Sequence, residues 1–189
     1  MFDQLLQFDY DTFIFINQGL ANVVFDFLMP LIRNKYFWSP LYLFLLVYLI
    51  INYKMQSLIV IGGIILTIVL ADQISSNLIK HAVERLRPCN DPFFSDNVRL
   101  LLNSCGSGYS FTSSHAPNHF ALSTFLFSVF SSKAKWIAPA VYIWAILVAF
   151  AQVYVGVHFP LDVLSGALVG TIIGAITALT VKKLGRFRA

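Results

Sequence analysis

The chain has 189 residues, of which 58% are hydrophobic and only 12% are charged, and its mean hydropathy is +0.73. Soluble domains carry roughly 25% charged residues, so this composition excludes an ordinary soluble domain and indicates an integral membrane protein. The formal net charge of +4 does not indicate nucleic-acid binding, because no basic strip is interleaved with exposed aromatic residues in a soluble context. We therefore expect the lipid bilayer and its headgroups as partners, and no nucleic acid.

The N-terminal region fits two placements. Residues 1–35 mix apolar side chains with aspartates and Pro30, which suits either an amphipathic helix at the membrane interface or a first spanning helix. No cleavable signal peptide is expected, because residues 1–20 carry three aspartates and lack a basic start followed by an apolar centre. Both placements of residues 1–35 stay open.

Long apolar segments in the rest of the chain predict an all-α, polytopic membrane helix bundle. Such segments are of the kind that can cross a hydrocarbon layer roughly 30 Å thick. Five of them are apparent, at about residues 38–52, 57–78, 118–131, 136–155 and 161–181. The bundle has six spans if residues 1–35 cross as well, and residues 1–189 are expected to form a single membrane domain.

The basic residues predict the orientation of this bundle. One side of the bilayer receives Lys54, Lys133, Lys135, Lys182, Lys183, Arg186 and Arg188. An excess of lysine and arginine marks cytoplasmic loops, so the polar interval of residues 80–115 is expected to be extracytoplasmic. The small size fits a bacterial inner membrane protein whose site faces the periplasm or the exterior.

The two cysteines of the chain, Cys89 and Cys105, both lie in this polar interval. A disulfide between them closes a loop of about 15 residues and stabilises the fold by roughly 3 kcal/mol in the chain-entropy model. Such a bond persists on an oxidising face of the membrane. We expect the disulfide, and the alternative is two free thiols.

His158 and Asp162 form a candidate chemical pair between two apolar runs. Pro160 suits the first turn of a helix, so a helix is expected to begin beside His158 and to run on through residues 166–170. Asp162 can then reach back to one ring nitrogen of His158, which leaves the other nitrogen free as a base or nucleophile. The alternative is that His158 only packs and that Asp162 complements the helix dipole.

A second cluster contains two cations, Lys80 and Arg87, directly before Pro88. Seven residues on a helix return to nearly the same face after about 10 Å, so both side chains are expected to project together. Arg87 offers a planar fork for phosphate oxygens, and Lys80 offers a point charge. The alternatives are contact with headgroups or a pair between Lys80 and Glu84.

A third cluster stands at the start of the next apolar segment. Ser113 or Ser114 can cap a helix there, and Pro117 fits its first turn. The N–H groups of a helix start attract anions, and His115 is placed to donate a proton to a leaving oxygen. The alternative is an ordinary serine cap beside an interfacial histidine.

Together the three clusters resemble the signature of the type 2 phosphatidic acid phosphatase superfamily, the membrane lipid phosphate phosphatases related to the vanadium haloperoxidases. The resemblance covers about residues 60–180. The family pattern K-x6-R-P is complete at residues 80–88, and P-S-G-H is replaced by T-S-S-H at residues 112–115. The third part, S-R-x5-H-x3-D, keeps its histidine and aspartate, but Ala151 and Gln152 replace its serine and arginine.

The resemblance implies a phosphatase that needs no metal and no organic cofactor. His158 would attack phosphorus to form a phosphohistidine, Asp162 would orient His158, and His115 would protonate the leaving group and then activate water. The phosphoryl oxygens would be held by Lys80, Arg87, Ser113, Ser114 and Gln152.

Gln152 is the main departure from the family pattern. Loss of a charge-assisted hydrogen bond costs roughly 1.5–3 kcal/mol unless another group compensates, and His119 and Arg85 are the candidates that the sequence offers. If the site only lacks a cation, Gln152→Arg should preserve or raise turnover. A large loss would indicate a pocket rebuilt around the amide.

Two other classes of function remain open. The residues His115, His119, His158 and Asp162 are of the types that bind zinc, so a metal-dependent membrane hydrolase is one alternative. A catalytically silent protein that binds or transports lipid phosphates is the other. For the phosphatase, the candidate substrates are undecaprenyl diphosphate, phosphatidylglycerol phosphate, phosphatidate and lipid A phosphates.

Overall fold

The computed structural model describes residues 2–130 and 136–185, and these residues form helices with no strand among them. The main helices are α1 (Phe2–Ile14), α2 (Val23–Ile32), α3 (Ser39–Tyr53), α4 (Met55–Gln73), α6 (His115–Phe130), α7 (Ile137–Tyr154) and α8 (Pro160–Gly185). Shorter helical segments are η1 (Phe15–Gly19), η2 (Ile74–Ile79), α5 (Lys80–Val83), η3 (Pro88–Asn90) and η4 (Ser95–Asn97). The predicted all-α bundle is confirmed.

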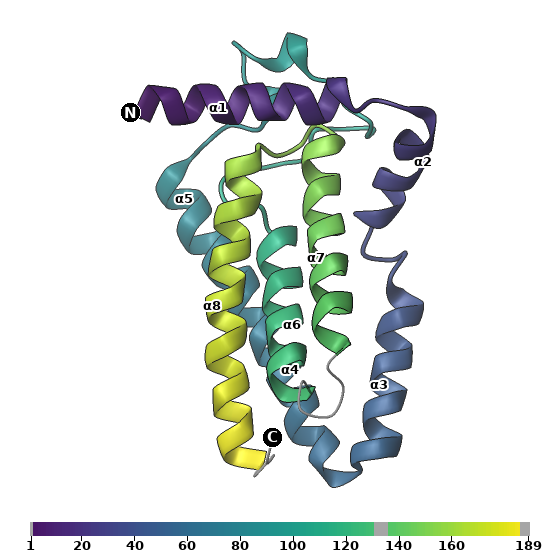
Figure 1. Cartoon of the computed structure of the whole chain (residues 1–189). Helices are drawn as coiled ribbons and strands as arrows, with labels where there is room; N and C mark the ends of the chain where they lie inside the picture. The colour runs from purple at the N-terminus through teal and green to yellow at the C-terminus, as the bar shows by residue number, and fades with distance from the viewer. Residues whose placement is uncertain (1, 131–135, 186–189) are drawn as a thin grey trace.

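The N-terminal helix lies across one end of this bundle (Figure 1). Segment Asp3–Gly19 meets α2 at an angle of 115°, so residues 1–35 do not form one straight helix. Helices α2 and α3 then descend one after the other, and α4 turns back after Lys54 (Figure 1). This arrangement favours the interfacial placement of α1.

The number of membrane spans stays a prediction. Three described helices are long and apolar enough to cross a bilayer, at Met55–Asn90, Ile137–Tyr154 and Pro160–Leu184. The bent pair of Asp3–Gly19 and Val23–Ile32 raises the number to four if it counts as one span, and Ser39–Tyr53 is a shorter apolar helix.

Helix α6 is the buried centre of the bundle, and it packs closely against α8. A Cβ at Gly170 would lie 2.3 Å from the carbonyl oxygen of Pro117, and one at Gly174 would lie 2.3 Å from that of Ala121. Only glycine permits this separation, because real Cβ contacts are much longer. The close approach fixes the start of α6, where His115 lies, against the start of α8, where Asp162 lies.

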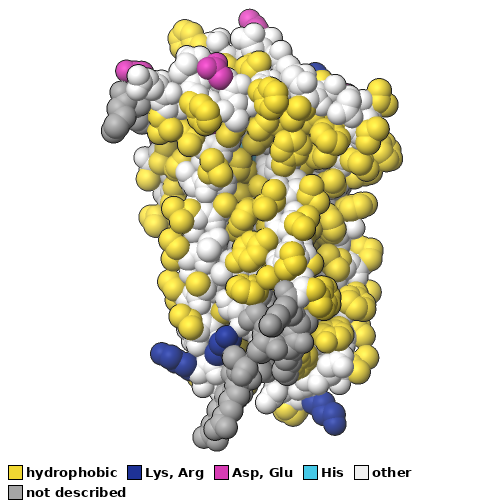
Figure 2. Space-filling model, in the orientation of Figure 1, with side chains coloured by type: hydrophobic (Ala, Val, Ile, Leu, Met, Phe, Trp, Pro, Cys, Tyr) yellow, Lys and Arg dark blue, Asp and Glu magenta, His cyan; other side chains and the backbone are white. Residues whose placement is uncertain are grey.

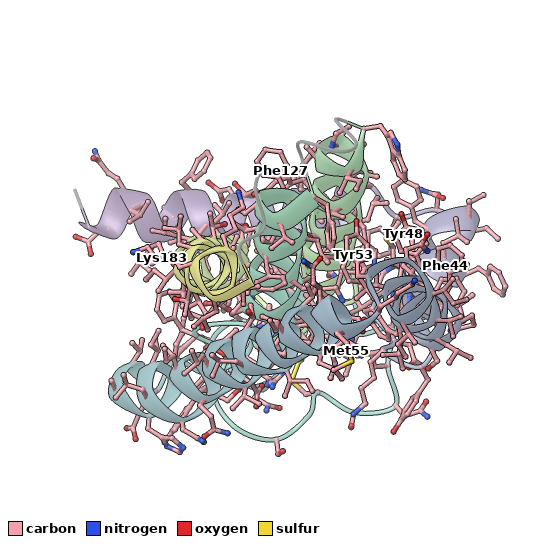
Figure 3. All side chains as sticks on the ribbon, turned by 90° about the horizontal axis from the view of Figure 1, so that it is seen from below. Phe44, Tyr48, Tyr53, Met55, Phe127 and Lys183 are labelled. Atoms are coloured by element: carbon pink, nitrogen blue, oxygen red, sulfur yellow. A yellow bond between two sulfur atoms is a disulfide. The ribbon has the colours of Figure 1, made fainter. Side chains whose placement is uncertain are left out.

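Apolar side chains cover the flanks of the bundle (Figure 2). Phe44, Leu58 and Leu164 are each more than 60% exposed, as expected of side chains that face lipid rather than water. Lysine and arginine appear mainly at the end opposite α1 in that view, although some is also visible near the α1 end, and Figure 3 shows Lys183 and Met55 from the end opposite α1. Four of the basic residues used to predict the orientation lie outside the described residues, namely Lys133, Lys135, Arg186 and Arg188.

The predicted disulfide is confirmed. Cys89 and Cys105 are bonded, with their Cα atoms 5.8 Å apart. The bond ties η3, which directly follows Arg87, to residues 102–107, which form one wall of the polar cavity described next.

Candidate active site

A polar cavity of about 350 Å³ opens where the starts of α5, α6 and α8 meet. It brings together five of the residues predicted to be catalytic or phosphate-binding, and Arg33 joins them as a cation that was not predicted. Its lining consists of Lys80, Arg87, Ser114, His115, His158, Arg33 and residues 102–107. Three cations and two histidines therefore surround one small volume.

His158 is oriented through a serine. The nearest oxygen of Asp162 is 3.7 Å from His158 Nδ1, which is too long for a hydrogen bond. Ser110 Oγ lies between them, 3.1 Å from the same nitrogen, and its hydroxyl donates to Asp162 Oδ2. The direct contact predicted from the spacing is thus replaced by a bridge, because Asp162 Oδ2 also accepts the N–H of Phe159 at the helix start (2.8 Å).

This chain of hydrogen bonds sets the tautomer of His158. Since the Ser110 hydroxyl donates to the carboxylate, its oxygen is left to accept a hydrogen bond from the Nδ1–H of His158. His158 Nε2 then carries the free lone pair. Burial of the ring lowers the pKa of His158 to about 4, although Asp162 opposes the shift. The imidazole is therefore neutral at pH 7 and can act as a nucleophile.

Arg85 holds the other side of the Asp162 carboxylate. Its Nη1 donates to Asp162 Oδ1 (2.9 Å), and its Nη2 donates to Asp9 Oδ2 (2.6 Å). Asp9 also accepts the N–H of Leu161 (2.8 Å), so α1 is fastened to the start of α8. The guanidinium of Arg85 stacks over Phe159 at 4.0 Å. Arg85 is therefore engaged by two carboxylates, and it is not among the residues that line the polar cavity.

Lys80 and Arg87 reach the cavity by a different route from the one predicted. They do not share a helix face, because α5 ends at Val83 and Glu84 takes a left-handed conformation with φ of 52°. Arg87 lies in extended backbone beyond this turn. Its guanidinium donates to the carbonyl oxygens of Ser107 (3.1 Å) and Gly108 (3.3 Å). The backbone directly after Cys105 therefore holds the Arg87 guanidinium at the cavity.

The serines at the start of α6 do not cap that helix through their hydroxyls in the described structure. Ser114 Oγ lies 2.9 Å from Ser76 Oγ. Ser113 Oγ is buried and has no hydrogen-bond partner among residues 2–130 and 136–185. A buried hydroxyl without a partner is costly, and Ser113 is not among the residues that line the polar cavity.

Gln152 is fully buried and is paired with an arginine from another helix. Its Oε1 accepts a hydrogen bond of 3.3 Å from Nε of Arg33, which directly follows α2. Gln152 Nε2 is buried without a partner in the described part of the chain. Burial, followed by the charge of Arg87, lowers the pKa of Arg33. The amide thus faces a third cation of the polar cavity.

His119 lies along a second, apolar cavity of about 590 Å³ between α3, α4 and α6. Its Nδ1 donates to the carbonyl oxygen of His115 (2.8 Å), and its ring packs edge-on against Trp144. His119 does not line the polar cavity. The described residues also contain no group of three or more His, Cys, Asp or Glu side chains placed to hold a metal ion, so the ligand set of the zinc hypothesis does not converge.

Three residues of this site were not identified from the sequence, namely Ser110, Arg33 and Asp9. Ser110 lies in the polar interval two residues before Thr112, so its proximity to the motif was a weak signal. Arg33 is 119 positions from Gln152 and Asp9 is 76 from Arg85. No local spacing could reveal such long-range pairs.

Several known proteins are similar to this chain. The family model described as the PAP2 superfamily matches residues 57–186. A lipid A 4'-phosphatase of Bacteroides thetaiotaomicron is 31% identical over 90% of this chain and 75% of its own length. An undecaprenyl-diphosphatase of Sulfolobus acidocaldarius is 28% identical over 89% of this chain and 76% of its own length.

Two solved structures resemble the fold. The crystal structure of Aquifex aeolicus LpxE has a TM-score of 0.65 and 28% identity, and the match covers 88% of this chain and 92% of that one. A transmembrane PAP2-type phosphatidylglycerolphosphate phosphatase from Bacillus subtilis has a TM-score of 0.72 over 97% of this chain and 90% of that one. Its identity is 20%, so this second likeness concerns the fold alone.

Proposed function

The chain belongs to the PAP2 superfamily, and from this premise we propose that it is an integral membrane phosphatase that removes phosphate from a lipid through a phosphohistidine at His158. The observation that carries the proposal is that two cavities share lining residues. Ser114 and His115 line both the polar cavity, which holds the cations and His158, and the apolar cavity between α3, α4 and α6. A phosphate on an apolar tail has the shape and chemistry to occupy both.

The first half of the reaction forms a phosphoryl enzyme. His158 Nε2 attacks phosphorus, the bond between phosphorus and the lipid oxygen breaks, and that oxygen takes a proton from His115. Burial, followed by the charge of Arg33, lowers the pKa of His115 to about 3. An anionic phosphate beside the ring opposes this shift, so His115 takes up its proton from solvent as the substrate binds. The Nδ1 proton of His158 stays on the ring and is donated in a hydrogen bond to Ser110 Oγ, and the Asp162 carboxylate stabilises the positive charge that builds on the ring. Lys80 and Arg87 hold the phosphoryl oxygens as charge spreads over them.

The second half releases phosphate. His115, now neutral, takes a proton from a water molecule. The oxygen of that water attacks phosphorus from the side that the lipid has left. The bond between phosphorus and Nε2 breaks, and His158 returns to its neutral form. His115 ends with the proton that it carried when the lipid phosphate was bound, so the reaction consumes water and no other reactant.

The substrate class follows from the relatives and the apolar cavity together. We propose a bacterial lipid phosphate, with a lipid A 4'-phosphate as the leading candidate, because the lipid A 4'-phosphatase relatives match about nine tenths of this chain. The apolar cavity is lined by side chains such as Leu45, Leu49 and Ile64, which suit acyl chains. We further propose that the protein resides in the inner membrane with this site facing the periplasm.

Phosphate release from a lipid panel tests the proposal. The panel contains lipid A, undecaprenyl diphosphate, phosphatidylglycerol phosphate and phosphatidate, each presented in detergent micelles. We expect release from at least one lipid, loss of that release in His158→Ala, and no effect of a chelator. Full activity in His158→Ala would overturn the mechanism, and activity abolished by the chelator and restored by zinc would favour the metal-dependent alternative.

A further inference from the structure

We propose that Arg33, held in place by Gln152, is a phosphate-binding residue of this active site, so that α2 supplies the cation that α7 lacks. This inference rests on the function proposed above and adds a substrate-binding residue and a positioning residue to it. Neither role is visible in the sequence, because Arg33 belongs to none of the three motif clusters.

The position of Arg33 is the first argument. Arg33 lines the same 350 Å³ cavity as His158, His115 and Ser114. It reaches this cavity from the end of α2, whereas Lys80 and Arg87 reach it from α5 and the loop beyond. The three cations therefore come from separate segments and converge on one volume, as binding of a group with several anionic oxygens requires.

Charge is the second argument. The lining of the cavity includes no aspartate or glutamate among the described residues, although it holds three cations. Arg33 forms no salt bridge within residues 2–130 and 136–185, whereas Arg85 and Arg99 each pair with a carboxylate. A half-buried guanidinium beside another cation is unfavourable unless an anion offsets the charge. A phosphoryl group in the cavity supplies that anion.

Gln152 provides the third argument. It is completely buried, and its amide oxygen accepts the Nε–H of Arg33, which leaves the two terminal nitrogens of the guanidinium for a ligand. A neutral amide can hold an arginine in this way, whereas an arginine at position 152 would repel Arg33. The glutamine is thus the complement of Arg33, and the two residues replace the single arginine of the family pattern.

The test combines lipid turnover with inhibition by inorganic orthovanadate, which resembles a phosphoryl group under attack. Arg33→Gln should lower kcat/KM by about tenfold to hundredfold, the usual effect of losing one charge-assisted hydrogen bond, and should raise the vanadate inhibition constant in parallel. Arg33→Lys should retain part of the activity and part of the vanadate affinity, because lysine keeps a point charge but lacks the planar fork of the guanidinium. Lys183→Gln removes one exposed charge at the opposite end of α8 and should match the unaltered protein.

Gln152→Glu tests the positioning role. The substitution keeps the shape of the side chain but gives Arg33 a carboxylate partner, so vanadate should bind as weakly as in Arg33→Gln while the melting temperature is kept. Unchanged kcat/KM and unchanged vanadate inhibition in Arg33→Gln would overturn the inference. Failure of the proposed function would give a different result. In that case the unaltered protein would release no phosphate from any lipid, or His158→Ala would release as much phosphate as the unaltered protein.

Discussion

Replacement of Gln152 by arginine restores the arginine of the family sequence pattern, and we expect it to lower the activity of this protein. The new guanidinium would sit in a fully buried position against Arg33, whose Nε is only 3.3 Å from the present amide oxygen. Two unit charges about 4 Å apart repel by about 4 kcal/mol at an effective dielectric constant near 20. If relaxation removes half of this energy, about 2 kcal/mol remains, which corresponds to a loss of roughly thirtyfold.

The assay measures kcat/KM on the best lipid substrate and the melting temperature of Gln152→Arg in the same detergent. We expect kcat/KM to fall at least about thirtyfold, because Arg33 must leave its place in the cavity. The double variant Arg33→Gln with Gln152→Arg removes the repulsion and returns one cation to the site, so it should regain much of the lost activity. Equal or higher turnover in the single variant would refute this reasoning and show that the site merely lacks a cation.

Three further predictions concern the frame of the site. Asp9→Asn removes one partner of the buried Arg85 ion pair, so kcat should fall about tenfold and the melting temperature should drop. Gly170→Ala places a methyl group against the Pro117 carbonyl and should lower the free energy of unfolding by about 1–3 kcal/mol in denaturant titrations. The pKa of His158, followed by NMR, should lie near 4. Because the unfolded chain then binds more protons, stability should fall as pH drops from about 6.5 toward 4, and a titration near 6.5 would contradict the burial.

The main features of the fold and most of the site were predictable because they depend on local sequence. Apolar segments predict helices, Pro160 marks the start of α8, and the two cysteines of one polar loop pair as expected. His115 and His158 converge because each stands at the start of a helix on the same end of the bundle.

The remaining features depend on contacts that no local pattern encodes. The left-handed turn at Glu84 breaks the helix that was expected to align Lys80 with Arg87. The bridge through Ser110 depends on how a loop folds back over α8. The hydrogen bond between Arg33 and Gln152 joins the end of α2 to α7, which are far apart in the sequence, so no local spacing points to Arg33.

Isolation of the phosphoryl enzyme tests the central claim most directly. His115→Gln removes the acid of the first half and the base of the second, so the reaction is started with p-nitrophenyl phosphate, whose leaving group departs without a proton. The intermediate should then accumulate, because the attacking water has lost its base. Mass spectrometry of the quenched protein should then find a phosphoryl group on His158, stable in base and labile in acid, and no such group in His158→Gln. A phosphoryl group on another residue, or undiminished turnover in His158→Gln, would contradict the account.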